Sequence, residues 1–180
     1  MDCLQTMRER RSIRQYKHEP VSEKQLRLVL EAAQNAPSWK NQQPWTYVIL
    51  HDRQQIQALK QATGGNPKGN AYENADYFLV VCADPEKSGN REGKPYYMTD
   101  IGNTLTQVTL AATALGLGTC WVGAFSEQPV KKLLGVPYHI RIVAITRWAY
   151  RTRHLPNGPK AAKPVGVCRI LGQLDEKIKI

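Results

Sequence analysis

One stretch of the chain decides its fold: Tyr97 to Phe125, which reads YMTDIGNTLTQVTLAATALGLGTCWVGAF. Apolar residues at helical spacing give its first part a single apolar face: Ile101, Leu105, Val108, Ala112 and Leu115. This pattern predicts a long helix from about Tyr97 to Leu117, which Gly116 and Gly118 bring to an end. The apolar run from Thr119 to Phe125 then predicts a strand that leads into a loop.

Shorter helical and strand patterns alternate on both sides of this stretch. A capping box at Ser22 to Gln25 opens a helix that is expected to stop near Asn35, because Pro37 disfavours a helical residue before it. Further helices are expected at 53–62 and between the cap Ser126 and Gly135. Strands are expected at 46–51, 76–83 and 139–146. This order of elements predicts an α+β or three-layer α/β domain.

The length of 180 residues predicts one domain, 1–180, in which 147–180 form an irregular, basic C-terminal arm. The sequence shows no secretory signal and no apolar run long enough to span a membrane. Its four cysteines lie far apart without a C-x-x-C pair, which argues against a zinc site and a disulfide scaffold. We therefore expect a cytoplasmic protein without a bound metal.

Positive charge gathers at the two ends of the chain. The net charge is +10; residues 1–17 hold five basic against two acidic side chains, and residues 147–180 hold eight against two. Basic ends of this kind are typical of a nucleic-acid or anionic surface, of a site for a small anion such as phosphate, or of an ordinary soluble surface.

Several common catalytic motifs lack their key residues. Gly64 and Gly69 have the spacing of a P-loop, but Asn70 stands where the lysine is required. Trp121 occupies the third glycine position of a loose dinucleotide-binding fingerprint. The histidines show no metal-ligand spacing, and no G-x-S-x-G motif is present. Kinase, hydrolase and metalloenzyme functions are therefore not expected.

Three segments carry more information. Arg10-Arg11-Ser12-Ile13-Arg14 suits an oxyanion or phosphate, which guanidinium groups bind through paired hydrogen bonds, although such a run is also typical of a solvated helix end. Ala36 to Trp45 is a polar loop with two prolines and two tryptophans, suited to recognising a flat polar group or to forming a rigid interface. In Gly116 to Phe125, small residues let backbone amides approach a ligand closely.

Together and in this order, these segments resemble the FMN-dependent nitroreductase family, in its small-subunit branch. The similarity runs from about Met7 to Thr146 and includes Tyr97 and Asp100-Ile101-Gly102 at the start of the long helix. The resemblance implies an α+β fold with a mixed, mostly antiparallel sheet flanked by helices, and an intertwined homodimer with FMN at its interface. It also implies NAD(P)H as a transient electron donor and a small-molecule acceptor, such as a nitroaromatic or a quinone, reduced by ping-pong hydride transfer.

The resemblance assigns cofactor contacts to the basic residues. It implies that Arg10, Arg11 and Ser12 hold the FMN phosphate and neighbouring polar groups, and that Arg14 lies near the pyrimidine edge of the flavin. Lys160 is similar to a late basic contact to the phosphate. A guanidinium at Arg14 would stabilise the negative charge of the reduced flavin.

Two loops complete the implied site. One matches a loop that reaches the flavin from the partner subunit: Pro37, Ser38, Trp39 and Asn41. The other matches a segment over one flavin face, where a backbone amide bonds the flavin N5: Trp121, Val122, Gly123 and Ala124. Because the flavin carries the chemistry and protons can come from solvent, no catalytic side chain is assigned.

The match weakens after the last core strand. Arg147 to Arg151 stands where the family has a Pro-Leu-Gly-Tyr-Pro-like turn, and Ala162 stands where an arginine is expected. Either Lys160 or Lys163 would then meet the phosphate.

Three other functions stay open on the sequence. A specialised family member, such as a dehalogenase or a flavin-modifying enzyme, needs extra segments for which 180 residues leave little room. A single-stranded nucleic-acid-binding module would use the basic ends and the four tryptophans, but these lie in the motif loops rather than along a basic stripe. A flavin-binding protein without turnover would hold FMN without consuming NADH.

Overall fold

The core of the domain is an antiparallel sheet. The computed structural model describes residues 2–66 and 70–152, and within them four strands pair in the order β1-β2-β6-β5. These strands are β1 (Trp45–Leu50), β2 (Tyr77–Ala83), β5 (Leu117–Thr119) and β6 (Arg141–Tyr150). An isolated parallel bridge between Ser12 and Thr119 adds the N-terminal segment to the β5 edge. The predicted mixed, mostly antiparallel sheet is therefore confirmed.

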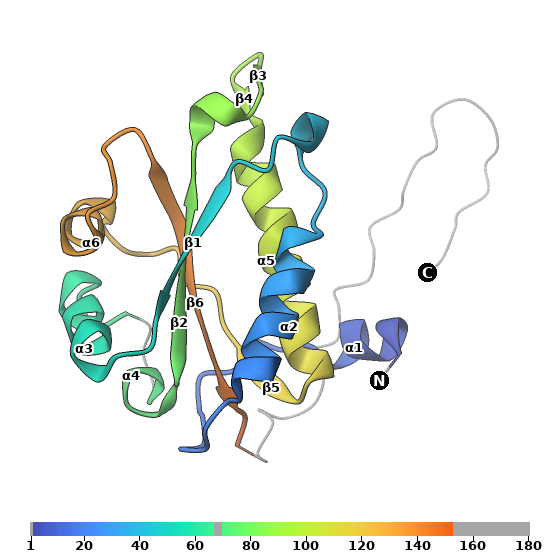
Figure 1. Ribbon diagram of the computed structural model, residues 1–180, viewed down its shortest axis with the longest axis vertical. Helices are drawn as coiled ribbons and strands as arrows, with labels where there is room; N and C mark the ends of the chain where they lie inside the picture. The colour runs from blue at the N-terminus through green and yellow to red at the C-terminus, as the bar shows by residue number, and fades with distance from the viewer. Residues whose placement is uncertain (1, 67–69, 153–180) are drawn as a thin grey trace, which may run out of the picture.

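Helices cover both faces of this sheet, so the domain has three layers (Figure 1). One face carries α2 (Glu23–Gln34) and α5 (Tyr96–Ala114); the other carries α3 (Arg53–Ala62), α4 (Ala71–Asn74) and α6 (Glu127–Leu134). Alternate residues of β2 pack into the two helical layers, because successive side chains of a strand point to opposite faces. Leu79 and Val81 pack under α2 and α5, and Phe78 and Val80 pack on the opposite side.

Local signals explain where two of the helices begin and end. The capping box of α2 is present, with the Ser22 hydroxyl accepting from the Gln25 amide and the Gln25 side chain accepting from Ser22. The Asp52 side chain caps α3 by accepting from the Gln54 and Gln55 amides, and Gly64 follows the helix with a φ of 65° that glycine adopts without strain. Ser126 occupies the predicted N-cap of α6, but its side chain makes no capping hydrogen bond.

The end of the long helix differs from the prediction. α5 stops at Ala114, and Gly116, with a φ of 79°, turns the chain directly into β5. Residues 117–119 pair with the end of β6, so the strand lies before the predicted segment 119–125. Beyond Thr119 that segment keeps a single bridge, from Val122 to Ile145. Helical spacing misses this boundary because Leu117 is as apolar as the helix residues before it.

The last strand is also longer than expected. β6 runs to Tyr150, so residues 147–150 belong to the central sheet and not to an irregular arm. Arg147 and Trp148 are fully buried in it. The predicted start of the arm is therefore wrong, and the rest of that prediction, with Lys160 and Lys163, lies outside the described residues.

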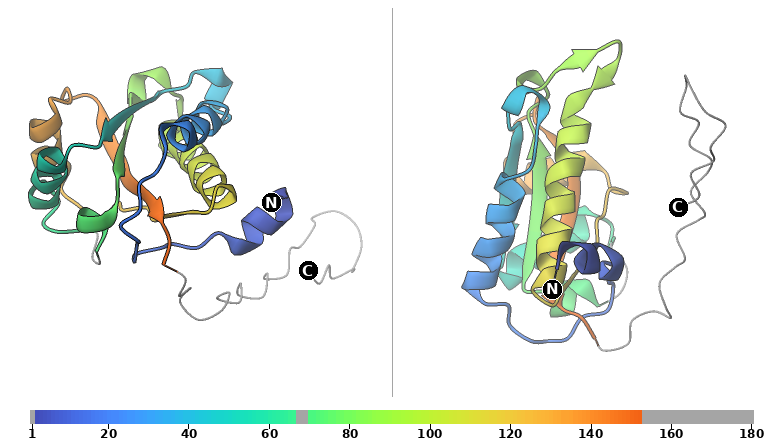
Figure 2. Two further views of the ribbon diagram at one scale, coloured as in Figure 1. Left: turned by 60° about the horizontal axis from the view of Figure 1, so that its bottom comes forward. Right: turned by 90° about the vertical axis from the view of Figure 1, so that its right-hand side faces the viewer.

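The sequence patterns also miss several short elements. α1 (Cys3–Glu9) begins at its N-cap Asp2 and projects from the body beside the C-terminal end of α5 (Figure 2). At the opposite end of α5 lie two short 3-10 turns and a two-stranded hairpin (Figure 1). These elements are η1 (Trp39–Asn41), η2 (Pro85–Lys87), β3 (Asn90–Arg91) and β4 (Lys94–Pro95).

Candidate functional site

The segment after α1 is held against the edge of the sheet. The Ile13 amide donates to the Thr119 carbonyl at 2.8 Å, and the Ile13 side chain lies directly over Gly118. A Cβ on Gly118 would come within 2.9 Å of the Ile13 Cβ and Cγ2 atoms, so this close approach requires glycine. The packing brings the arginine run beside the loop that follows β5.

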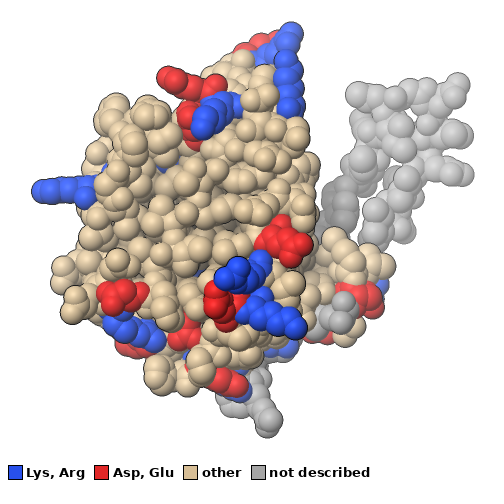
Figure 3. All heavy atoms as spheres, in the orientation of Figure 1, with Lys and Arg blue, Asp and Glu red and all other residues tan. Residues whose placement is uncertain are grey.

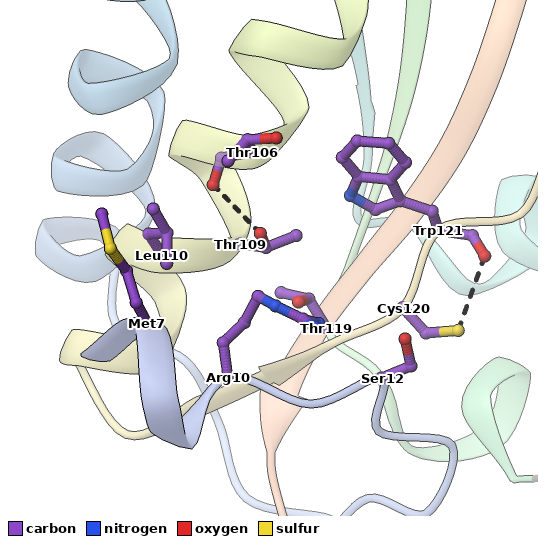
Figure 4. Close-up of a pocket in the computed structure, with 9 residues that line it drawn as sticks. All are labelled: Met7, Arg10, Ser12, Thr106, Thr109, Leu110, Thr119, Cys120 and Trp121. Atoms are coloured by element: carbon purple, nitrogen blue, oxygen red, sulfur yellow. Dashed lines mark hydrogen bonds between the residues drawn. The ribbon is translucent and has the colours of Figure 1, made fainter. Parts of the chain in front are cut away.

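A pocket of about 520 Å³ opens where these segments meet the C-terminal half of α5 (Figure 4). Its lining comes from three elements and combines small polar, apolar and basic side chains: Met7, Arg10, Ser12, Thr106, Thr109, Leu110, Thr119, Cys120 and Trp121. Figure 4 shows the Arg10 side chain reaching from the end of α1 toward Thr109 and Thr119, with the Trp121 indole standing farther along the pocket.

A second pocket of about 430 Å³ shares Cys120 and Trp121 with the first. Its other lining residues are Arg14, Asn66, Val122, Gly123 and Ala124. Because the two pockets share a wall, we treat them as one groove, with Arg10 and Ser12 at one end and Arg14 at the other. Their volumes lie in the range typical of sites for small ligands and cofactors.

The groove is positively charged. Neither Arg10 nor Arg14 forms an ion pair with any described residue. The Arg11 guanidinium instead donates to the Arg8 and Arg10 carbonyls at the end of α1, at 2.6 and 2.7 Å, and Arg11 lines neither pocket. Two guanidinium groups without carboxylate partners make the groove suited to an anionic ligand.

Backbone amides add a second kind of donor. The Val122 amide is committed to the Ile145 carbonyl at 2.8 Å, whereas those of Gly123 and Ala124 have no acceptor among the described residues. A Cβ on Gly123 would meet nothing closer than the Val143 carbonyl at 3.9 Å, so packing within the chain does not require this glycine. The missing side chain instead leaves open the space over the groove.

Several residues that line the groove were not predicted as site residues, among them Asn66 and Cys120. Asn66 faces Arg14 across the second pocket, and its side chain donates to the Ala124 carbonyl at 2.5 Å. Cys120 lies in the wall common to both pockets and is 4 % exposed. The isolated Asn66 carries no sequence signal, whereas Cys120 stands inside the glycine-rich segment that the sequence analysis singled out.

The loop from Pro37 to Asn41 lies elsewhere. Its backbone is fixed by α5, because Asp100 accepts from the Trp39 amide at 2.8 Å and the Asn103 side chain donates to the Pro37 carbonyl at 3.1 Å. The Trp39 ring packs between Tyr96, with ring centroids 6.3 Å apart, and Gly89, where an added Cβ would lie 2.5 Å from the ring.

This loop is strained and exposed. Lys40, Asn41 and Gln43 all adopt a positive φ, between 47° and 55°, which is uncommon for residues other than glycine. The Ser38 hydroxyl accepts from the Gln43 amide at 2.9 Å and so helps to hold this shape. Strained backbone of this kind is concentrated at functional sites, because the surrounding structure must maintain it.

Within one chain, the predicted site residues therefore form two groups. The arginine run and the 121–124 segment meet at the groove, at the C-terminal half of α5. The 37–41 loop sits at the N-terminal end of the same helix (Figure 1). From Asp100 to Thr109 the helix advances about 14 Å.

The described surface does not support nucleic-acid binding. On the face shown in Figure 3, basic side chains are interspersed with acidic ones, without a continuous basic stripe. Trp148 is fully buried, and Trp39 is packed against Tyr96. Of the four tryptophans, Trp121 alone is classed as exposed, at 42 %. Stacking on single strands needs several accessible rings, and the described residues offer one exposed tryptophan.

The described residues lack two other kinds of feature. Among these residues, no helix has the length and hydrophobicity to cross a membrane. In the same ranges, no group of three or more His, Cys, Asp or Glu side chains is placed to hold a metal ion.

Comparisons with known proteins show the family of the chain. The model of the Nitroreductase family matches residues 7–74 and 65–148. Over 155 residues the chain is 32 % identical to a protein of Archaeoglobus fulgidus that is provisionally named NADH dehydrogenase/NAD(P)H nitroreductase. The alignment covers 83 % of this chain and 85 % of that protein.

Solved structures share the fold. A nitroreductase family protein from Clostridium novyi NT superposes with a TM-score of 0.79 at 29 % identity, over 85 % of this chain and 87 % of that one. An FMN-dependent nitroreductase from Clostridium difficile R20291 superposes with a TM-score of 0.74 at 26 % identity, over 84 % of this chain and 89 % of that one. The family match spans most of the described domain, and this chain belongs to the nitroreductase family.

Proposed function

We propose that the chain is an FMN-dependent oxidoreductase that takes electrons from NAD(P)H and passes them to a nitroaromatic, a quinone or a similar small acceptor. One observation carries the proposal: two arginines without carboxylate partners, Arg10 and Arg14, lie at opposite ends of one groove walled by residues 120–124. The names of the similar proteins support the same activity and cofactor.

The phosphate of FMN would bind at the Arg10 end. Arg10 reaches into the pocket beside Ser12, and Thr119 and Thr109 offer further polar groups around it. A guanidinium matches the geometry and charge of a phosphate group. Arg11, whose side chain is engaged with carbonyls of α1, would act on the phosphate only indirectly, by holding the turn in place.

The ring system would lie toward Arg14. There Arg14 and Asn66 offer donors to the carbonyl groups of the pyrimidine ring, and the amides of Gly123 and Ala124 offer donors to the flavin N5. FMN, when bound, supplies the hydride chemistry at N5 and leaves negative charge over N1 and the C2 carbonyl. Arg14 would stabilise that charge because it is a fixed cation placed where the charge develops.

The residues of the groove leave little room for acid–base catalysis by the protein. Apart from the two arginines, the titratable side chain among the lining residues is the thiol of Cys120. Protons would therefore come from solvent through the open side of the groove, and no catalytic side chain is assigned.

We further propose that the site is completed by a second copy of the chain. The 37–41 loop is tied to α5 at Asp100 and Asn103, on the N-terminal side of the groove residue Thr106, and we infer that it reaches the flavin of another subunit. α1 presents Leu4 and Met7 to solvent at 64 % and 52 % exposure, and Met98 on α5 is 49 % exposed. Apolar residues on a projecting helix are suited to an interface between two copies.

The test begins with the purified protein. We expect it to absorb as a flavoprotein, to release FMN rather than FAD on heating, and to oxidise NAD(P)H with parallel lines in double-reciprocal plots against the acceptor. A colourless protein that takes up no added FMN would contradict the proposal. A yellow protein that oxidises neither NADH nor NADPH would instead be a flavin carrier without turnover.

A further inference from the structure

Arg147 is a buried cation without a counter-charge. It lies in the central strand β6 with an exposed fraction of 0 %. Among the described residues, its guanidinium forms no ion pair, and none of its three nitrogens has a hydrogen-bond partner of good geometry, although the Tyr16 side chain lies close enough for a weak one. Its nearest recorded interaction is with the ring of Tyr16, whose centroid lies 5.7 Å from the Arg147 Cζ.

Such a residue is expected to cost stability. A charge removed from water without a partner carries a desolvation penalty that a single aromatic face only partly offsets. A buried hydrophobic residue of similar size would avoid this penalty. The burial of Arg147 is thus explained better by what its charge does than by what it contributes to packing.

The charge lies just behind the groove. Ile145, two residues earlier on the same face of β6, exchanges both backbone hydrogen bonds with Val122, which lines the Arg14 end. Two strand residues span about 7 Å. Burial raises the pKa of the Tyr16 hydroxyl, and Arg147, Cys120 and Arg14 are among the charges that act on this hydroxyl. Arg147 and the groove residues Cys120 and Arg14 therefore act on one and the same hydroxyl, and Arg147 itself lies over the Tyr16 ring.

We propose that Arg147 is a second fixed cation of the site, placed behind Tyr16 and Cys120, which stabilises negative charge at the Arg14 end of the groove. The inference rests on the proposed binding of FMN, whose N1 and C2 carbonyl would lie there. Arg147 touches neither cofactor nor substrate in this account and acts through its field. In a poorly solvated interior, a unit charge two strand residues from the wall of the groove still changes the electrostatic potential within it substantially.

Sulfite provides a direct probe of this field. It adds through its sulfur to N5 of oxidised FMN, and the electron pair it donates leaves negative charge over N1 and the C2 carbonyl. Bleaching of the flavin absorbance therefore yields a dissociation constant that depends on cations near these atoms. We would measure it for the FMN-loaded wild type, Arg147→Met and Arg147→Lys.

A matched control removes the same charge from the surface. Arg27 is exposed and pairs with Glu23 on α2, so Arg27→Met lowers the net charge equally without altering the interior. We expect Arg147→Met to weaken sulfite binding about tenfold, Arg147→Lys to restore most of it, and Arg27→Met to leave it unchanged. The midpoint potential of the bound flavin should fall in Arg147→Met alone.

Two further readouts, FMN affinity and melting temperature, separate this role from its alternatives. FMN affinity should change little in Arg147→Met, and its melting temperature should stay level or rise. Unchanged sulfite binding in a folded, FMN-loaded Arg147→Met would overturn the inference and leave the proposed function intact. A large fall in melting temperature together with weakened sulfite binding in Arg147→Lys would show that Arg147 supports Tyr16 by packing. Failure of wild type to bind FMN would overturn the proposed function itself.

Discussion

The groove and the 37–41 loop differ in their residues and in their backbone conformation. The groove is lined by arginines, small residues and open backbone amides, and it forms where three segments of one chain pack together. The loop is a strained stretch of backbone that a buried carboxylate, Asp100, ties to the far end of α5. The first region has the donors for a ligand but stands open. The second has a fixed shape and lines neither part of the groove.

This difference explains how a small domain builds a cofactor site. α5 carries one region near each end, so the helix keeps them apart within a chain. In the proposed two-fold dimer, the same helix would present the loop of one copy to the groove of the other. Each region can therefore be disturbed separately, and the consequences differ.

The largest effect should come from removing the charges of the groove. In Arg10→Ala/Arg14→Ala, the proposed phosphate and pyrimidine contacts are both lost, and hydrogen bonds to charged groups are worth about 1.5–3 kcal/mol each. We expect the FMN dissociation constant, measured by fluorescence titration, to rise by about two orders of magnitude or more. Arg8→Ala/Arg27→Ala removes the same charge elsewhere and should leave it unchanged. Equal affinity in both double variants would contradict the assignment.

Substitutions at two glycines should each disturb the packing of one of the two regions. Gly118→Ala forces the Ile13 side chain away from β5, and Gly89→Ala displaces the Trp39 ring. Each should lower the free energy of unfolding by about 1–3 kcal/mol because of overpacking. Gly102→Ala on α5 meets nothing within 4 Å and should be neutral or stabilising. In chemical denaturation, destabilisation by Gly102→Ala as large as that by the other two would refute this reading.

The carboxylate that holds the loop should matter for turnover more than for retention of cofactor. Asp100→Ala leaves the Trp39 amide and the Ser88 hydroxyl without their acceptor, at a cost of about 1–3 kcal/mol. Because Arg10 and Arg14 are untouched, we expect most of the FMN to remain while NAD(P)H oxidation falls. Asn103→Ala removes one exposed bond to the same loop and should have a smaller effect. Loss of FMN equal to that in the double arginine variant would argue against the division.

Acid should loosen the loop end of α5 before the groove. Hydrogen bonds from Arg141 hold the pKa of Glu127 below its usual value, and Arg141 also donates to the Tyr97 hydroxyl at the start of α5. A lowered pKa contributes stability above the ordinary pKa, and this stability is lost as pH falls through the folded value. Glu127→Gln should therefore flatten the dependence of the melting temperature on pH below about 5. An unchanged slope would exclude Glu127 as its source.

Regular patterns made most of the fold predictable from the sequence. The bounds of α2 and α3 follow from capping residues and apolar spacing, and β1 and β2 from their β-branched runs. The beginning of β5 and the end of β6 depend on tertiary pairing that local signals do not show. Arg147 and Tyr150 look like parts of a polar tail in the sequence, yet they extend a central strand.

The candidate site was predictable only through its motifs. The arginine run and the glycine-rich segment are distinctive, and the structure brings Arg10, Ser12, Arg14 and Trp121 to one groove. Asn66 carries no local signal, because its place in the groove depends on a contact distant in sequence, its hydrogen bond to the Ala124 carbonyl. The unpaired state of Arg147 is likewise a property of its surroundings and not of its neighbours in sequence.

The exchange of the loop between two chains is the central claim, and a mixed dimer tests it most directly. One variant carries Arg10→Ala and Arg14→Ala, and the other carries Ser38→Ala and Asn41→Ala; each homodimer should be nearly inactive. A mixed dimer collects both defects in one site and leaves the other intact. Unfolding and refolding equal amounts together with FMN should restore about a quarter of the wild-type activity. A mixture that forms mixed dimers and stays as inactive as its parents would show that the loop acts within its own chain.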